Sequence, residues 1–118
     1  MTVSEVAKIL NAEFFACPEL ADTTEIHSAC GSDMMSDVLA FVKDQAVLLT
    51  GLLNPQVIRT AMMMDMQCVV FVRGKKPTPD ILQLAESCKL TVLATSERLY
   101  TACGKLYAAG LRGGETIE

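Results

Sequence analysis

Two acidic and two serine side chains follow a small-residue break in the first third of the chain. They lie in the segment Gly31-Ser32-Asp33-Met34-Met35-Ser36-Asp37. Because residues three and four positions apart share a helix face, a helix opening here would present Asp33, Ser36 and Asp37 together near its N-terminus. Such a face can accept hydrogen bonds from a ligand's hydroxyl or amino groups, and two carboxylates together with substrate phosphates can hold Mg²⁺. A purely structural role is the alternative, because acidic side chains in a first turn complement the helix dipole.

A second polar break, Thr50-Gly51 followed by Asn54, would form the other wall of such a site. Gly51 permits close approach to the backbone, and a helix beginning after Asn54 would offer free N–H groups to an anion. The basic cluster Arg73-Gly74-Lys75-Lys76 can supply cations for a phosphate, although the sequence has no glycine-rich phosphate-binding motif. A turn, a helix cap and a solvated loop are the alternative interpretations of these segments.

The breaks separate short apolar runs from amphipathic helices, and this unit recurs from about residue 24 onward. Uninterrupted apolar runs at 46–49 and 69–72 are typical of central parallel strands covered on both faces. Parallel strands need helical crossovers, so the pattern predicts a three-layer α/β domain with a mostly parallel sheet of about five strands. Open α/β sheets bind ligands at the edge where strand ends meet helix N-termini. The predicted binding residues at that edge are Gly31, Ser32, Asp33, Ser36, Asp37, Thr50, Asn54, Gly74 and Thr95.

Capping signals mark the helices that must position this edge. Thr2 with Glu5 matches a capping box, Asn54 and Thr78 each precede a proline, and Gly110 is predicted to be a C-cap. Strands are predicted over 13–17, 24–29, 46–49, 69–72 and 91–94. Helices are predicted over 3–10, 79–89 and 97–109, and two more are predicted to begin after Gly31-Ser32 and at Pro55. The helix after Gly31-Ser32 has its apolar positions at Met34, Met35, Val38, Leu39 and Val42.

Methionines crowd the helix that begins at Pro55, and apolar residues occupy more than one of its faces. Flexible thioethers suit an adaptable contact surface, so this helix is a candidate interface for a second copy or for a partner protein. Internal core is the alternative. The candidate interface residues are Met62, Met63, Met64 and Met66.

Five cysteines, an odd number with no CxxC pair, indicate reduced and mostly buried thiols. His27 lacks a second histidine, which favours a structural or surface role. If their strands were neighbours, Cys17, Cys30 and His27 would converge and permit a metal or iron–sulfur contact. No Ser/His/Asp, Cys/His or metal constellation points to an enzyme, although Asp33 and Asp37 in a cleft would be capable of acid–base work.

Composition narrows the classes of partner. The net charge is −4, and two Tyr, four Phe and no Trp leave no aromatic and basic platform for polymeric nucleic acid. No apolar run approaches the roughly 20 residues that span a bilayer, and the first ten residues lack signal-peptide features. We therefore expect one cytoplasmic domain over residues 1–118, with no membrane partner and a flexible tail at 112–118.

Several short segments together resemble the DRTGG domain family over nearly the whole chain. Residues 31–39 are similar to that family's G-D-L-L-S-D-V segment, and Val47-Leu48-Leu49-Thr50 with Asn54 resembles its apolar strand, threonine and downstream asparagine. The likeness continues through Val69 to Gly74, Pro77, Ala85, Thr95, Ala102 and Gly110-Leu111. The eponymous motif is altered, because Ala21-Asp22-Thr23-Thr24-Glu25 keeps the aspartate but lacks the arginine and both glycines.

The resemblance implies a regulatory or ligand-sensing module that pairs as a homodimer and has no established catalytic activity. Related domains resemble the N-terminal domain of HPr kinase/phosphorylase and occur in phosphotransacetylases and between the CBS domains of some pyrophosphatases. Stand-alone copies accompany iron-only hydrogenase proteins. An adenine nucleotide or another phosphorylated metabolite is therefore the expected ligand, without a cofactor. A docking module for a hydrogenase-related partner is the alternative.

Overall fold

The computed structural model describes residues 1–40 and 45–113 of the chain. Its sheet has five strands in the order β1-β5-β4-β3-β2. Strands β2 to β5 run parallel to one another, and β1 pairs with β5 in the antiparallel direction. The α/β fold with a mostly parallel five-stranded sheet is therefore confirmed. The strands are β1 Glu13–Ala16, β2 Ser28–Gly31, β3 Ala46–Thr50, β4 Cys68–Phe71 and β5 Thr91–Ala94.

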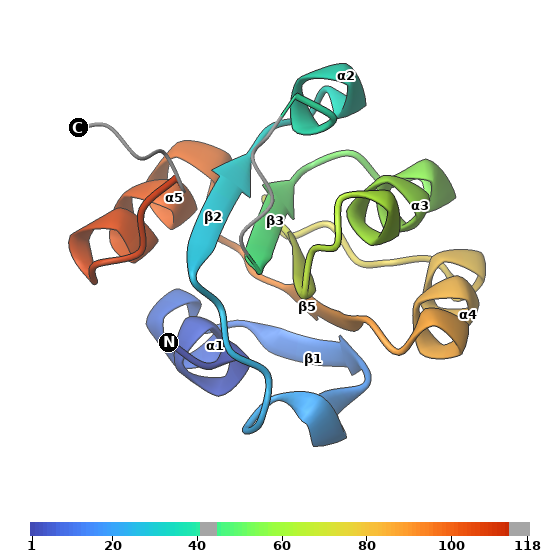
Figure 1. Cartoon of the computed structure of the whole chain (residues 1–118), viewed down its shortest axis with the longest axis horizontal. Coiled ribbons are helices and arrows are strands. Elements are labelled where there is room, and N and C mark those ends of the chain that lie inside the picture. The colour runs from blue at the N-terminus through green and yellow to red at the C-terminus, as the bar shows by residue number, and fades with distance from the viewer. Residues whose placement is uncertain (41–44, 114–118) are drawn as a thin grey trace.

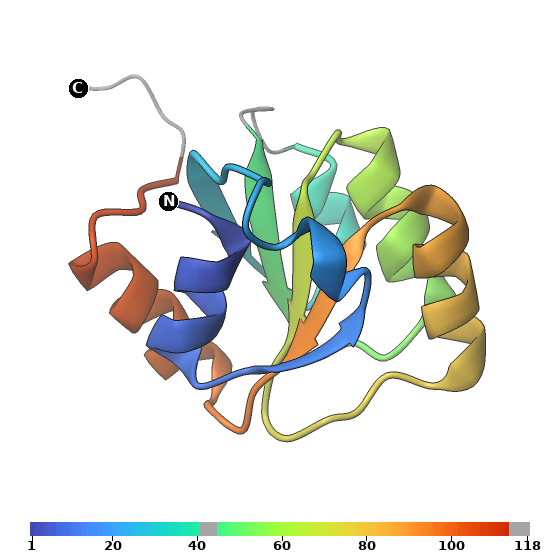
Figure 2. The same cartoon turned by 90° about the horizontal axis from the view of Figure 1, so that it is seen from below.

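Helices cover both faces of this sheet, as Figures 1 and 2 show. One face carries α1 (Val3–Leu10) and α5 (Leu99–Ala108), and the other carries α2 (Met35–Val38), α3 (Pro55–Met63) and α4 (Pro79–Cys88). Alternate residues of each strand feed separate cores: in β3, Leu48 faces α3 and α4, whereas Val47 and Leu49 face α1 and α5. Every residue of β3, β4 and β5 is buried, as expected of strands covered on both sides.

The predicted caps explain where several helices begin and end. Thr2 and Glu5 form a capping box at the start of α1, and the backbone N–H of Thr2 holds the pKa of Glu5 below its usual range. The Asn54 side chain accepts a 2.8 Å hydrogen bond from the backbone N–H of Gln56 and so caps α3. Gly110, at φ +106°, follows α5 in a conformation that favours glycine.

The strand predicted over 24–29 is wrong in its position, because β2 begins only at Ser28. The preceding residues are tied to the start of α1 instead: the carbonyl of Thr24 accepts from the N–H of Val3, and Glu25 forms an isolated bridge with Thr2. Only from Ser28 onward does the chain lie against β3. β2 then ends at Gly31, where a Cβ would lie 2.4 Å from the Cys103 sulfur of α5.

The helix predicted after Gly31-Ser32 is wrong in its start and length, because α2 contains only Met35–Val38. The Ser32 hydroxyl accepts a 3.0 Å hydrogen bond from the N–H of Met34 and forms a turn that delays the helix. Of the apolar positions expected on its buried face, Val38 is buried, whereas Met34 and Leu39 are exposed. Val42 lies outside the described residues.

The tail at 112–118 was predicted to be flexible, but its first residue is held in place by the sheet. Arg112 forms an isolated parallel bridge with Ser28, and its carbonyl accepts a 2.8 Å hydrogen bond from the N–H of Ala29. The remainder of the predicted tail, 114–118, lies outside the described residues. Among the helices of the described part, none has the length and apolar content needed to cross a bilayer.

We predict that Asn54→Ala lowers the free energy of unfolding by about 1 kcal/mol, because the N–H of Gln56 loses its side-chain acceptor. The measurement is urea-induced unfolding followed by circular dichroism. Thr78→Ala is the matched control, because Thr78 also precedes a proline at a helix start, but its hydroxyl donates to the exposed Asp80 side chain and caps no backbone N–H. Equal losses in the two variants would contradict this account of the α3 cap.

Candidate functional site

The carboxyl ends of β2, β3, β4 and β5 meet at one edge of the sheet, since these strands are parallel. Each strand is followed there by one of the polar breaks seen in the sequence. This is the position where open α/β sheets place ligands. The breaks are Ser32-Asp33, Gly51 to Asn54, Arg73 to Lys76 and Thr95-Ser96.

Asp33 joins the ends of β2, β3 and β4. One carboxylate oxygen accepts a 2.6 Å hydrogen bond from the backbone N–H of Gly51 and a 3.3 Å bond from the Thr50 hydroxyl. The other oxygen lies 3.8 Å from the guanidinium of Arg73. A Cβ on Gly51 would lie 2.4 Å from that guanidinium, so glycine leaves the space over which Arg73 lies. Arg73 itself has φ +64°.

Thr95, which follows β5, stabilises the next part of the edge through the hydrogen bonds of its buried side chain. Its buried hydroxyl donates to the carbonyl of Leu10 at 2.7 Å and accepts from the N–H of Glu97 at 3.2 Å. The backbone N–H of Gly74 donates to the Thr95 carbonyl at 3.0 Å, and that of Arg73 donates to the Glu97 carbonyl at 2.7 Å. The side chain of Thr95 is therefore occupied by structural hydrogen bonds, and its contribution to a site comes from the surface around it.

A cavity of about 320 Å³ opens beside Thr95 at this edge. Its volume is at the lower end of the range for small-molecule sites. Lys76 lies at its wall, with its ammonium 3.2 Å from a Glu13 carboxylate oxygen, and both side chains are exposed. The cavity is lined by Asn11, Ala12, Glu13, Gly74, Lys76, Ala94, Thr95 and Ser96.

The structure brings together only some of the predicted binding residues. Asp33 and Thr50 are in direct contact, and Gly74 and Thr95 line the cavity. Ser36 and Asp37 lie on the exposed side of α2, whereas Asp33 precedes that helix, so the three do not share one helical face. Gly31 contacts α5, Ser32 forms the turn before α2, and Asn54 caps α3.

Three cavity residues that could contact a ligand were absent from the predicted set: Asn11, Glu13 and Ser96. Lys76 belongs to the basic cluster that the sequence had already indicated as a source of cations for a phosphate. No sequence signal places Asn11 and Glu13 here, because their position depends on the antiparallel pairing of β1 with β5, in which Glu13 lies opposite Ala94.

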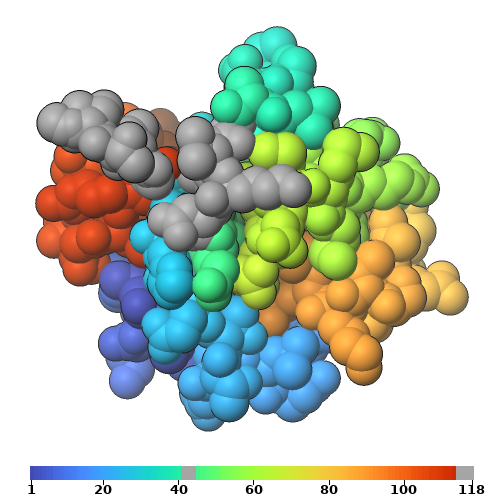
Figure 3. Space-filling model, viewed as in Figure 1, coloured from blue at the N-terminus to red at the C-terminus, as the bar shows by residue number. Residues whose placement is uncertain are grey.

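The methionine cluster is divided between core and surface. Met64 is 9% exposed and Met66 is 3% exposed, so both lie in the core. Met62 and Met63 at the end of α3 are 41% and 62% exposed. Only these two remain candidates for an interface. Two further exposed apolar residues, Met34 and Leu39, flank α2, which packs beside α3 and forms the projecting lobe in Figure 3.

All five cysteines are free thiols. Cys17 and Cys68 are buried, and burial raises the pKa of both; that of Cys17 rises to about 11, with a further contribution from its hydrogen bond to Glu86. Burial also raises the pKa of Cys30 and Cys103. These four thiols are protonated at neutral pH and are therefore poor nucleophiles.

The convergence considered for Cys17, Cys30 and His27 does not occur. Cys17 follows β1 and Cys30 lies in β2, and these two strands form opposite ends of the sheet. A metal or iron–sulfur contact shared by these residues is therefore excluded by the strand order.

Comparison with known proteins identifies a domain family. The family model described as the DRTGG domain matches residues 5–109. A solved structure with a TM-score of 0.74 and 16% sequence identity contains the CBS and DRTGG domains of the regulatory region of Clostridium perfringens pyrophosphatase, complexed with the activator diadenosine tetraphosphate. The similarity covers 89% of this chain and 45% of that one, so this chain corresponds to less than half of the solved region. A search of curated proteins gave no match.

We predict that Asp33→Ala lowers the free energy of unfolding by about 1–3 kcal/mol, because the N–H of Gly51 loses a part-buried hydrogen bond to a charged acceptor. Arg73→Ala is the control, and its cost should stay below about 1 kcal/mol, because the ion pair to Asp33 is exposed and long. Urea unfolding of both variants measures the difference. A loss in Arg73→Ala as large as that in Asp33→Ala would contradict the assignment of Asp33 as the acceptor that holds this edge.

Proposed function

Because the chain belongs to the DRTGG domain family, we propose that it is a non-catalytic regulatory module that binds an adenine nucleotide or another phosphorylated small molecule at the carboxyl edge of its sheet. The observation that carries this proposal is the cavity beside Thr95, which has the Lys76 ammonium at its wall. A lysine ammonium is a mobile point charge suited to a phosphate. Its partner Glu13 is exposed, so a phosphate can replace that carboxylate at low cost.

Arg73 supports a phosphate at the same edge. It immediately precedes Gly74, which lines the cavity, although Arg73 itself lies beside the cavity over Gly51. Its side chain is 45% exposed, and its guanidinium is 3.8 Å from Asp33. An ion pair of this length and exposure is weak, so the guanidinium is available to a second phosphate group. Two cations on one loop suit a ligand with more than one phosphate. A nucleotide activator is bound by the pyrophosphatase regulatory region, which makes an adenine nucleotide the first ligand to test.

We predict that ATP, AMP or another adenine nucleotide raises the melting temperature of the protein in a saturable way, because a ligand that binds only the native state stabilises it. Lys76→Ala should weaken binding, measured by calorimetry, roughly tenfold or more through the loss of a charge-assisted hydrogen bond. Lys75→Ala is the matched control, because Lys75 is adjacent in sequence but does not line the cavity. Equal weakening in both variants, or none in Lys76→Ala, would place the ligand elsewhere.

A docking role is the second candidate, and the exposure of Met62 and Met63 favours it. Two large apolar side chains at the end of α3 are exposed in the single chain, and methionine adapts to varied partners. We propose this face as the contact for a second copy in a homodimer. A partner protein such as a hydrogenase-related one would use the same adaptable side chains.

We predict that the protein has twice the 12.7 kDa mass of one chain in light scattering and that Met63→Glu shifts it to the monomer. A charge buried without a partner in an apolar contact is costly. Gln56→Glu, an exposed change in the first turn of the same helix, should leave the dimer intact. A Met63→Glu protein that remains dimeric would exclude this face as the dimer contact.

A further inference from the structure

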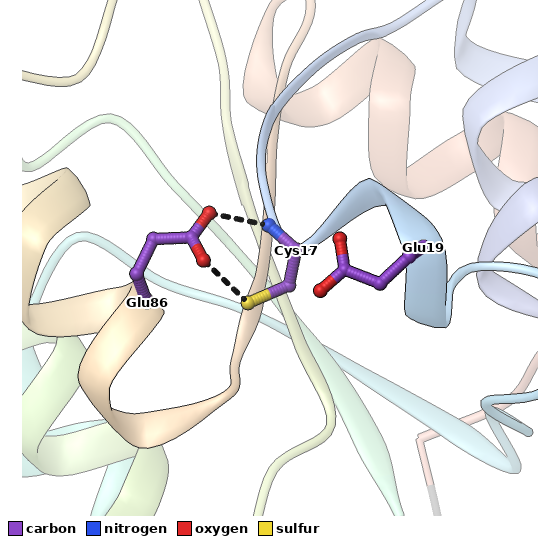
Figure 4. A group of neighbouring side chains, drawn as sticks. All are labelled: Cys17, Glu19 and Glu86. Carbon is purple, nitrogen blue, oxygen red and sulfur yellow. Dashed lines mark hydrogen bonds between the residues drawn. The ribbon is translucent and has the colours of Figure 1, made fainter.

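Three metal-ligating side chains converge at the junction of β1, η1 (Pro18–Leu20) and α4, away from the candidate ligand site. Figure 4 shows the carboxylates of Glu19 and Glu86 on either side of Cys17. One Glu86 oxygen lies 3.5 Å from the Cys17 sulfur. One ligand atom from each of the three residues lies within 4.8 Å of both others.

The local backbone brings the three donors together from two parts of the chain. Cys17 ends the β1 segment at φ +51°, and Pro18 opens the short 3-10 turn that carries Glu19. Glu86 comes from the last turn of α4, and its second oxygen accepts a 2.9 Å hydrogen bond from the backbone N–H of Cys17. This bond fixes the carboxylate while its first oxygen faces the sulfur. Cys17 is buried, whereas both glutamates are exposed, which leaves the group open to an ion from solvent.

The negative charges of the group are only partly offset by a neighbouring cation, because Lys89, which follows α4, lowers the pKa of the Cys17 thiol while Glu86 and Glu19 raise it. Within the described part of the chain, the ion pairs at 4.0 Å or less involve the carboxylates of Glu25, Asp33, Glu13 and Glu97. Glu19 and Glu86 form none of these ion pairs, so two carboxylates and the single Lys89 cation leave an excess of negative charge beside the Cys17 sulfur. Within this part of the structure, the arrangement provides a negative potential and three donor atoms at the same point.

The donor types select a particular class of cation. Mg²⁺ and Ca²⁺ take oxygen ligands, whereas Zn²⁺ accepts both thiolate sulfur and carboxylate oxygen. With Zn–S near 2.3 Å and Zn–O near 2.0–2.2 Å, tetrahedral donors stand about 3.5 Å apart. The Cys17 sulfur and the Glu86 oxygen already have this separation.

We propose that Cys17, Glu19 and Glu86 bind one Zn²⁺-like cation, with water at the fourth position. The thiol releases its proton to solvent as the sulfur coordinates the ion. The site would join the β1–η1 segment to the end of α4. It lies toward the amino ends of the parallel strands, because Ala16 pairs with Val92 while Glu13 pairs with Ala94 at the other end of the same antiparallel ladder. It is therefore separate from the cavity proposed for a phosphorylated ligand.

The test is a titration of the reduced, metal-free full chain with Cd²⁺, which reports a sulfur ligand through cadmium–thiolate charge-transfer absorption, and with Zn²⁺ in competition. We expect one equivalent to bind, and Cys17→Ser to abolish the absorption. Glu86→Gln keeps an acceptor for the N–H of Cys17 but removes the charge, and it should weaken Cd²⁺ binding at least tenfold. Glu19→Gln, at an exposed position, should also weaken binding.

Cys88→Ser is the matched control, because Cys88 lies two residues from Glu86 on α4 but outside the donor group. It should retain one equivalent of Cd²⁺ with unchanged affinity. The proposal is overturned if the wild-type protein shows no stoichiometric absorption change, if Cys17→Ser retains it, or if both glutamate variants bind like the wild type. Should Cys17→Ser not fold, the two glutamate variants decide the matter.

Discussion

Parallel pairing of β2 to β5 is the constraint on which the rest of this structure depends. Parallel strands end together, so their carboxyl ends bring four polar breaks to one edge, where backbone groups beyond the last ladder bonds still need partners. Asp33 provides an acceptor for the N–H of Gly51, and Thr95 provides one for the N–H of Glu97. The edge is thus held by side chains that follow β2 and β5, and the cavity opens beside the second of these, Thr95.

Whether a feature of this fold could be predicted depends on whether it has a local signal in the sequence. Buried β-branched runs and helix caps act locally, so the central strands, the start of α3 at Pro55 and the end of α5 before Gly110 agree with expectation. Long-range pairing is different. The position of β2 depends on its register with β3, and the cavity depends on β1 lying antiparallel to β5, neither of which has a local signal. Asp33 was correctly placed at the edge but for another reason, because the Ser32 turn keeps it outside α2.

The domain has two chemically different ends. Lys76 and Arg73 bring positive charge to the carboxyl edge, whereas Cys17, Glu19 and Glu86 bring a soft donor and negative charge to the opposite side of the β1–β5 ladder. A phosphorylated ligand and a thiophilic cation would therefore bind without competing for residues. β1 belongs to both regions, since Glu13 lies at the cavity and Cys17 follows the other end of the strand.

The proposed regulatory function depends on binding of a nucleotide at the carboxyl edge. The most direct measurement is a nitrogen-15 correlation spectrum of the assigned protein during titration with ATP. We expect the largest shifts on residues 11–13, 74–76 and 94–96, which line the cavity or lie between lining residues. Shifts confined to the surroundings of Cys17 or to the exposed end of α3, or no shifts at millimolar ATP, would contradict this proposal.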